Sequence, residues 1–200
     1  MPYFVNQTAF DDPNNWRRAQ GVDLNPKNAI VDPRGNVLAY AQTGGMIAPS
    51  RFALTSGQKI YRFGGAGRTT RDVATGAWWV EQRQFEILLS FAQTHDLALG
   101  MAVRLLCLAP PEWSDISLLV RARIVRDLLA WRGLANTVVI PATAGNPTVR
   151  LPHQNEIAAR RLAQLFIPGL DGPGTARAAI QIENDYPLDA EASRRGFLYL

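Results

Sequence analysis

Residues suited to binding an anionic, aromatic ligand gather between positions 59 and 92. Arg62 stands between aromatic neighbours in a short strand-like segment, residues 60–63, which stops at a glycine-rich loop beginning with Gly64. A buried arginine is costly unless an anion or a carboxylate meets it, and glycines let the backbone come close to a ligand. The pattern therefore indicates a nucleotide-like ligand beside Arg62.

A pair of tryptophans follows in a second predicted strand, residues 76–80. Neighbouring residues on a strand point to opposite sides, so one of Trp78 and Trp79 is expected in the core and the other at a cleft. A purely structural alternative stays open. In it, Arg62 pairs with a carboxylate such as Glu183, and both tryptophans only anchor a sheet.

Composition excludes several classes of site. One cysteine and two histidines exclude a disulfide scaffold, a cysteine-based zinc site and a histidine-rich metal site, so no metal is expected. No uninterrupted apolar stretch is long enough to span a membrane. No Sec-type signal peptide is recognised, which favours residence in the cytoplasm of the producing cell or secretion by a dedicated system. The net charge of +4 comes from scattered arginines, a distribution that does not favour nucleic-acid binding.

Hydrophobic periodicity predicts the elements that would position these residues. Residues 1–50 are rich in turn signals and are expected to be an irregular segment packed on a domain formed by residues 51–200; a short strand is expected at 37–41. The remaining predicted elements are helices at 81–94, 113–131 and 153–163, and strands at 137–140, 164–167 and 178–183. Residues 97–109 are predicted as a buried strand, with a helix as the alternative. The mixed order predicts a single α+β domain with a split, largely antiparallel central sheet flanked by helices.

The order of these motifs resembles the ADP-ribosyltransferase superfamily. Its members place an arginine or histidine on an early strand, a hydroxyl residue or an aromatic on a second strand, and a glutamate on a later strand. Tyr-Arg-Phe-Gly at 61–64 is similar to the first element, and Gly-Ala-Trp-Trp at 76–79 to the second, with Thr75 as the nearest hydroxyl. The resemblance implies NAD as the cofactor, bound by the residues Arg62, Gly64, Thr75, Trp78, Trp79 and Gln164.

The catalytic glutamate implied by the resemblance has two main candidates. Glu183 and Glu156 both lie in Gln-x-Glu patterns, and Glu183 is preferred because it falls on a predicted strand. Residues 164–169 resemble the strand of the family glutamate, but Gln164 stands where the acid would be. In a related branch of toxins that degrade NAD, the acid follows the second strand, which would make Glu81 or Glu86 the candidate.

The resemblance predicts a mono-ADP-ribosyltransferase that modifies a protein substrate, as a bacterial effector or toxin. The alternatives are an NAD-degrading toxin of the same fold and a non-catalytic interaction protein of the immunity or adaptor kind. The oligomeric state is not predicted.

Overall fold

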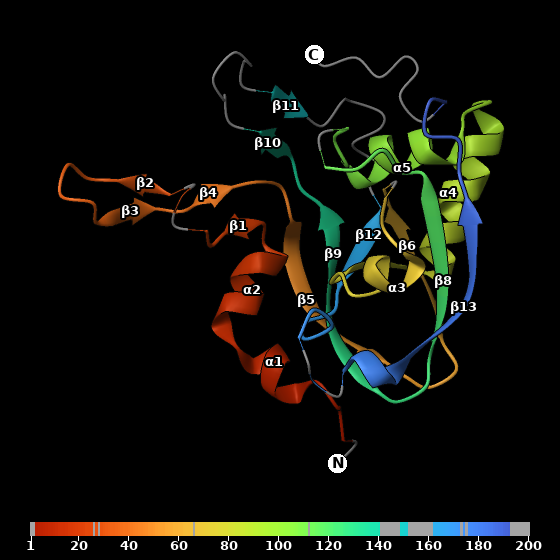
Figure 1. Cartoon of the computed structure of the whole chain (residues 1–200), viewed down its shortest axis with the longest axis horizontal. Coiled ribbons are helices and arrows are strands. Elements are labelled where there is room, and N and C mark those ends of the chain that lie inside the picture. Colours follow the sequence, from red (N-terminus) through yellow and green to blue (C-terminus); the bar gives the residue numbers. More distant parts are fainter. Residues whose placement is uncertain are drawn as a thin grey trace.

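A seven-stranded antiparallel sheet forms the centre of the molecule (Figure 1), in the order β13–β8–β6–β7–β12–β9–β5. This computed structural model describes residues 3–25, 27, 29–65, 67–111, 113–140, 149–151, 162–172, 174 and 176–192. The sheet strands are β5 (Met46–Leu54), β6 (Lys59–Gly64), β7 (Trp78–Glu81), β8 (Leu118–Ile124), β9 (Leu128–Ala135), β12 (Ala163–Phe166) and β13 (Ile180–Pro187). The predicted α+β class, a largely antiparallel sheet flanked by helices, is confirmed.

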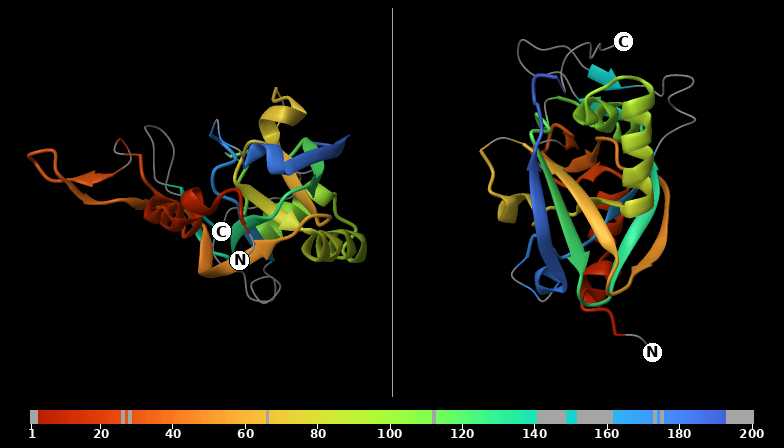
Figure 2. Two further views of the ribbon diagram at one scale, coloured as in Figure 1. Left: turned by 90° about the horizontal axis from the view of Figure 1, so that it is seen from below. Right: turned by 90° about the vertical axis from the view of Figure 1, so that its right-hand side faces the viewer.

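Helices lie on both faces of this sheet, as Figure 2 shows. Helices α4 and α5 cover one face, and the short helix α3 lies on the other, against β6 and β8. The helices are α1 (Gln7–Asp11), α2 (Pro13–Ala19), α3 (Thr70–Val73), α4 (Gln82–Thr94), α5 (Leu99–Cys107) and the 3-10 helix η2 (Arg177–Ala179). Three small strand pairs complete the described chain: β1 (Val22–Asp23) with β4 (Ala41–Gln42), β2 (Ile30–Val31) with β3 (Val37–Ala39), and β10 (Val138–Ile140) with β11 (Val149–Leu151).

The sheet opens between β6 and β7. These strands pair only at Ile60 with Glu81 and at Tyr61 with Val80, and no pairing continues beyond Tyr61. One step further along β6, Nη1 of Arg62 donates a hydrogen bond to the main-chain carbonyl of Trp78 on β7. An arginine side chain thus replaces the strand pairing at the point where the two strands separate.

Each face of the sheet has its own hydrophobic core. Tyr61 and Val80 pack with α4 and α5, and the ring of Tyr61 stacks on Phe85 of α4 at 3.9 Å between centroids. On the opposite face, Ile60 and Trp79 are buried with residues of β8, β9 and β12. The alternation of side chains along β6 and β7 therefore assigns neighbouring residues to different cores.

Several predicted elements are confirmed close to their expected bounds. The strands expected at 60–63, 76–80 and 164–167 are β6, β7 and β12, and the helix expected at 81–94 is α4. The strand expected at 37–41 is β3, which forms a hairpin with β2, and that at 137–140 is β10. The strand expected at 178–183 begins two residues later and is longer, because η2 occupies residues 177–179.

The helix predicted at 113–131 is wrong, because this segment contains β8 and the first half of β9. Leucines and isoleucines at helical spacing suggested one apolar stripe. In the structure, Val120, Ala122 and Ile124 are fully buried and alternate with Arg121 and Arg123. This period of two is the signature of a strand with one covered face.

The buried strand predicted at 97–109 is also wrong, and the alternative, a helix, is confirmed as α5. A continuous apolar run does not distinguish a buried strand from a buried helix by periodicity. Helix α5 is enclosed on most sides, and Leu108 ends it in a left-handed conformation with φ of 53°. Most of the helix expected at 153–163 lies outside the described residues, and Ala163 begins β12.

Residues 1–50 are more regular than expected. The turn signals expected in this segment include Asp12–Pro13. In the structure, Asp12 caps α2 by accepting a hydrogen bond from the Asn14 N–H, and Pro13 occupies the first helical position. The expected boundary at residue 50 falls inside β5, which pairs with β9. The β2–β3 hairpin extends away from the sheet (Figure 1), and its residues Val31, Val37 and Leu38 are exposed.

Asn6 attaches the N-terminal segment to the sheet. Its side chain is 3% exposed; Nδ2 donates to the carbonyls of Leu129 at 2.8 Å and Pro168 at 3.1 Å, and Oδ1 accepts from the Leu129 N–H at 2.8 Å. Asn6→Ala should lower the free energy of unfolding by about 2–4 kcal/mol, because buried backbone groups lose their partners. Urea unfolding measures this loss. The exposed Asn14→Ala is the control, with a change within about 0.5 kcal/mol; an equally small effect at Asn6 would contradict the assigned role.

Candidate functional site

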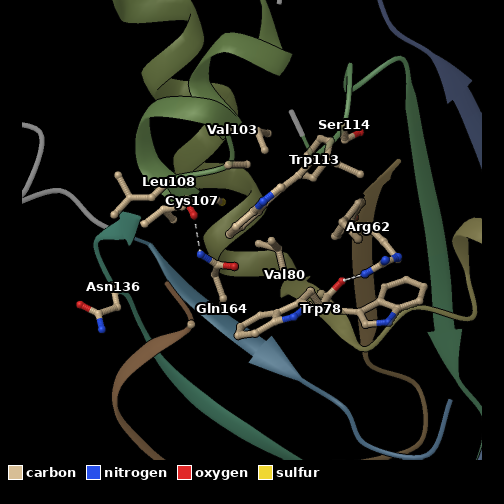
Figure 3. Close-up of a pocket in the computed structure, with 16 residues that line it drawn as sticks. Arg62, Trp78, Val80, Val103, Cys107, Leu108, Trp113, Ser114, Asn136 and Gln164 are labelled. Atoms are coloured by element: carbon tan, nitrogen blue, oxygen red, sulfur yellow. Dashed lines mark hydrogen bonds between the residues drawn. The ribbon is translucent and has the colours of Figure 1, made fainter. Parts of the chain in front are cut away.

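A cavity of about 250 Å³ lies where β6 and β7 separate. Strands β6, β7 and β12 form its floor, and the end of α5 with the following loop covers it (Figure 3). The labelled residues that line it are Arg62, Trp78, Val80, Val103, Cys107, Leu108, Trp113, Ser114, Asn136 and Gln164. The side chains thus come from segments far apart in the sequence, and most of the lining is apolar or aromatic.

Arg62 provides the positive charge of the cavity. Burial lowers the pKa of its guanidinium from 12.5 to about 10, with a smaller contribution from the nearby charge of Arg68. Its Nε is buried and has no hydrogen-bond partner among the residues that the structure describes. A Cβ added to Gly76 would lie 1.8 Å from Nη2 of Arg62, so the glycine provides the space for the guanidinium. An anion that approached Arg62 would supply the acceptor and the negative charge that this group lacks.

A polar groove of about 450 Å³ adjoins the cavity and shares Arg62, Phe63, Trp113 and Ser114 with it. Its further lining includes Gly64, Gly65, Arg68, Val73 and Asp115. The cavity alone is smaller than the roughly 300–1,000 Å³ typical of sites for drug-sized ligands. Together, the cavity and the groove form a longer depression with Arg62 at their junction.

Gln164 presents a hydrogen-bond acceptor to the cavity. Its Nε2 donates to the main-chain carbonyl of Cys107 at 2.9 Å, near the end of α5. Because a carbonyl only accepts, this contact determines which way the amide lies, and Oε1 faces the cavity (Figure 3). Cys107 itself contributes no nucleophile there, because burial raises the pKa of its thiol to about 12.

The two tryptophans have different environments. Trp79 is 1% exposed, lies in the core and donates from Nε1 to the Gly76 carbonyl at 2.7 Å. Trp78 is half-buried; its ring lies edge-on to Phe166 at 5.2 Å and borders the cavity. The strand alternation therefore buries the side chain of Trp79 in the core, although Trp79 is also among the residues that line the cavity, and leaves Trp78 half-buried beside it.

Two further residues expected at the site have local structural contacts. A Cβ on Gly64 would lie 2.5 Å from a methyl of Val73, so this glycine permits α3 to pack on β6; it also lines the polar groove. The hydroxyl of Thr75 donates to the Asp72 carbonyl at 2.7 Å, at the end of α3, and Thr75 does not line the cavity.

The structure does not bring Glu183 to the cavity. It lies on β13, an edge strand, where Oε1 accepts from Nε of Arg123 at 2.5 Å and Oε2 lies 3.1 Å from Nε of Arg121. The hydrogen bond from Arg123 is the main reason that the pKa of Glu183 lies below its ordinary value, and the charges of Arg123 and Arg121 act in the same direction. Among described residues, its observed contacts are those of an ion-pair network.

The other glutamates considered also lie away from the described lining. Glu81 pairs with Arg132 at 2.6 Å, and Glu86 on α4 accepts from Gln82 at 3.0 Å. Glu156 lies outside the described residues. No aspartate or glutamate lines the cavity within the described part of the chain.

The segment after α5 contributes residues that sequence patterns did not identify. Trp113 and Ser114 were expected to begin a helix, yet they border both the cavity and the groove. Arg104, fully buried in α5, holds this segment by donating to the carbonyls of Ala109 at 3.3 Å and Ser114 at 2.8 Å. The sequence signal that could have identified Trp113 as a site residue was its position after two prolines. No sequence signal pointed to Asn136.

No known family and no curated protein matches the sequence. Among solved structures, "Rhs1-CT in complex with cognate immunity protein RhsI1" aligns with a TM-score of 0.39 and 12% identity, over 71% of this chain and 83% of that chain. A likeness this weak carries no argument about function. Within the described residues, no helix is long and apolar enough to cross a membrane, and no group of three or more potential metal ligands occurs.

Trp79→Ala should lower the free energy of unfolding by about 3–5 kcal/mol, because it removes a large, fully buried side chain. Trp78→Ala should cost clearly less, since Trp78 is only half-buried. Urea unfolding of both variants measures the difference. Equal losses would mean that Trp78 is simply part of the core.

Glu183→Gln should reduce the acid sensitivity of folding. A carboxylate whose pKa is depressed by folding stabilises the protein above its ordinary pKa, and this stabilisation disappears as the pH falls. The wild type should therefore lose stability between about pH 5 and pH 2 more steeply than Glu183→Gln. Urea midpoints across this range test the prediction, with Glu86→Gln as the control. An unchanged slope in Glu183→Gln would show that the ion pairs contribute nothing.

Proposed function

We propose that this protein binds NAD at the opening between β6 and β7 and transfers ADP-ribose from it to a protein. The observation that carries the proposal is the adjacency of β6, β7 and β12 in the sheet. Arg62, Trp78 and Gln164, which occupy the three motif positions of the transferase resemblance, all line one cavity although they are distant in sequence. This arrangement suits a ligand with a flat ring and a phosphate group.

Each of these residues has a chemical role in the proposal. Arg62 would hold a phosphate by a charge-assisted hydrogen bond, and Trp78 would pack against the nicotinamide. The acceptor oxygen of Gln164 would bind a ribose hydroxyl. Cleavage breaks the bond between ribose and nicotinamide, nicotinamide leaves with the electron pair, and positive charge develops on the ribose.

A carboxylate is needed to stabilise that charge and to accept the proton of the attacking nucleophile. Glu183 is bound to two arginines on the edge strand, and Gln164 is neutral at every pH of interest. Glu156, which precedes β12 in the sequence, is therefore the first carboxylate to test.

A second candidate is a non-catalytic interaction protein that binds the ligand without cleaving it. The amide of Gln164 favours this function, because it occupies the motif position of the acid and is fixed by the Cys107 carbonyl. A neutral amide binds a hydroxyl but stabilises a developing cation much less than a carboxylate does.

The binding half of the proposal is tested by calorimetric titration with NAD. Arg62→Ala should weaken binding at least about tenfold, and Arg62→Lys should not restore it, because the guanidinium fork is lost. Gly76→Ala should also weaken binding, since its methyl group displaces the guanidinium. Gly172→Ala is the control, because the added methyl would lie no closer than 4.0 Å to any described atom. If all variants bind NAD as the wild type does, the cavity is not its site.

The catalytic part of the proposal is tested by measuring the release of nicotinamide and the transfer of labelled ADP-ribose to protein. Under the transferase proposal, Glu156→Gln should lower turnover on the order of a hundredfold with little change in NAD affinity. Under the second candidate, the wild type binds NAD without turnover, and Gln164→Glu introduces measurable nicotinamide release. Nicotinamide release without transfer to any protein would identify an NAD-degrading enzyme.

A further inference from the structure

A second groove, separate from the cavity, lies between α3 and the edge strand β13. Its volume is about 480 Å³, and it is lined by Arg71 and Ala74 from the α3 segment, Leu170, Arg177 of η2, and Ile180 and Ile182 of β13. It lies on the sheet face opposite α4 and α5, where the hydroxyl of Thr70 on α3 donates a hydrogen bond to the carboxylate of Asp185 on β13. We call it the β13 groove.

The floor of the β13 groove is apolar. Ile180 and Ile182 pair with Ile124 and Ala122 of β8, whose fully buried side chains belong to the core on this face. Because the two isoleucines lie two residues apart on one strand, their side chains point to the same side of the sheet. Ile182 remains 38% exposed, so an apolar side chain of a partner could gain contact area there.

Two arginines flank this apolar floor. Arg71 and Arg177 are both exposed, and neither forms an ion pair with another described residue. Asp72 is the acidic neighbour on α3, and its carboxylate accepts hydrogen bonds from the hydroxyl of Thr69, at 2.7 Å, and from its backbone N–H in a capping box. The charges of Arg177 and Arg68 also act on Asp72, which shows that the arginines gather at this helix.

The groove also runs beside an open edge of the sheet. Strand β13 is the last strand in the described order, and only β8 pairs with it. The outward N–H and C=O groups of such an edge are available to an additional strand. The described strand is eight residues long, and its pairing with β8 shifts register between Ile182 and Asn184, so a short extended segment could pair with the part that borders the groove.

We propose that the β13 groove is a docking site for an extended, acidic segment of a protein partner. Such a segment would pair with the open edge of β13, place aliphatic side chains on Ile180 and Ile182, and direct carboxylates to Arg71 and Arg177. The combination of an apolar floor and an open strand edge favours a peptide over a nucleic acid, whose backbone offers neither matching surface. The proposal does not depend on NAD binding.

The position of the groove relates it to the cavity. Helix α3 separates them: its residue Val73 lines the polar groove beside Arg62, whereas Arg71 lines the β13 groove. A protein segment bound along β13 would therefore lie across one helical turn from the proposed NAD site.

The test uses a fluorescein-labelled peptide of ten residues that alternates glutamate with valine, and fluorescence anisotropy at neutral pH. The wild type should bind it with a Kd below about 100 µM, within the range of weak, transient recognition. The variant Arg71→Glu/Arg177→Glu should weaken binding at least about tenfold, because attraction becomes repulsion. Ile182→Ser should weaken it severalfold. Arg83→Glu, an equal charge change at an exposed site on α4, should stay within about twofold of the wild type.

Two further probes determine the nature of the site. A peptide with serine in place of valine should bind at least about fivefold more weakly, since it leaves the floor uncovered, and the glutamate–valine peptide should slow amide exchange along β13. No binding of the glutamate–valine peptide at 1 mM, or an unchanged Kd in Arg71→Glu/Arg177→Glu, would overturn the proposal. Tighter binding of a ten-nucleotide single-stranded DNA that depends on the same arginines would also overturn it, in favour of a nucleic-acid surface.

Discussion

The hydrogen bond from Arg62 to the Trp78 carbonyl is the contact on which the site depends. Two strands that separate inside a sheet leave backbone groups without partners, and a buried carbonyl left in that state is costly. The guanidinium satisfies the Trp78 carbonyl across the gap, so the sheet can open without losing this bond. The guanidinium is consequently buried from solvent, and this burial lowers its pKa to about 10. The same interaction fixes a buried positive charge at the point where β6 and β7 separate.

The roof of the opening is held by a second set of main-chain acceptors. Helix α5 ends at Leu108, and the last carbonyls of a helix have no partner within it. The Cys107 carbonyl accepts a hydrogen bond from the Gln164 amide. Buried Arg104 donates hydrogen bonds to the carbonyls of Ala109 and Ser114, which lie on either side of Trp113 in the sequence. These contacts connect α5 to β12 and position the aromatic wall.

Local patterns predicted the fold well where burial is one-sided. Helix α4 has buried positions at Phe85, Leu88 and Ala92 with exposed residues between them, so its period is visible in the sequence. The prediction failed at 97–109, because a continuous apolar run has no period that separates strand from helix. It failed at 113–131 because leucines and isoleucines at helical spacing concealed the alternation of buried residues with Arg121 and Arg123. It also failed at Asp12–Pro13, because the same residues serve a turn and a helix start. In each case the packing partners, which are distant in sequence, decided between two locally acceptable structures.

The amino-acid sequence alone determined the chemistry that is available: a strand-end arginine between aromatics, adjacent tryptophans, a glutamine in a short strand, and too few cysteines and histidines for a metal site of those ligands. Only the tertiary structure decided that Arg62, Trp78 and Gln164 share one cavity while Glu183 pairs with Arg121 and Arg123 elsewhere. The physical reason is that spacing along a strand determines the face on which a side chain lies. The order of strands across the sheet, which long-range pairing and burial select, determines which side chains meet.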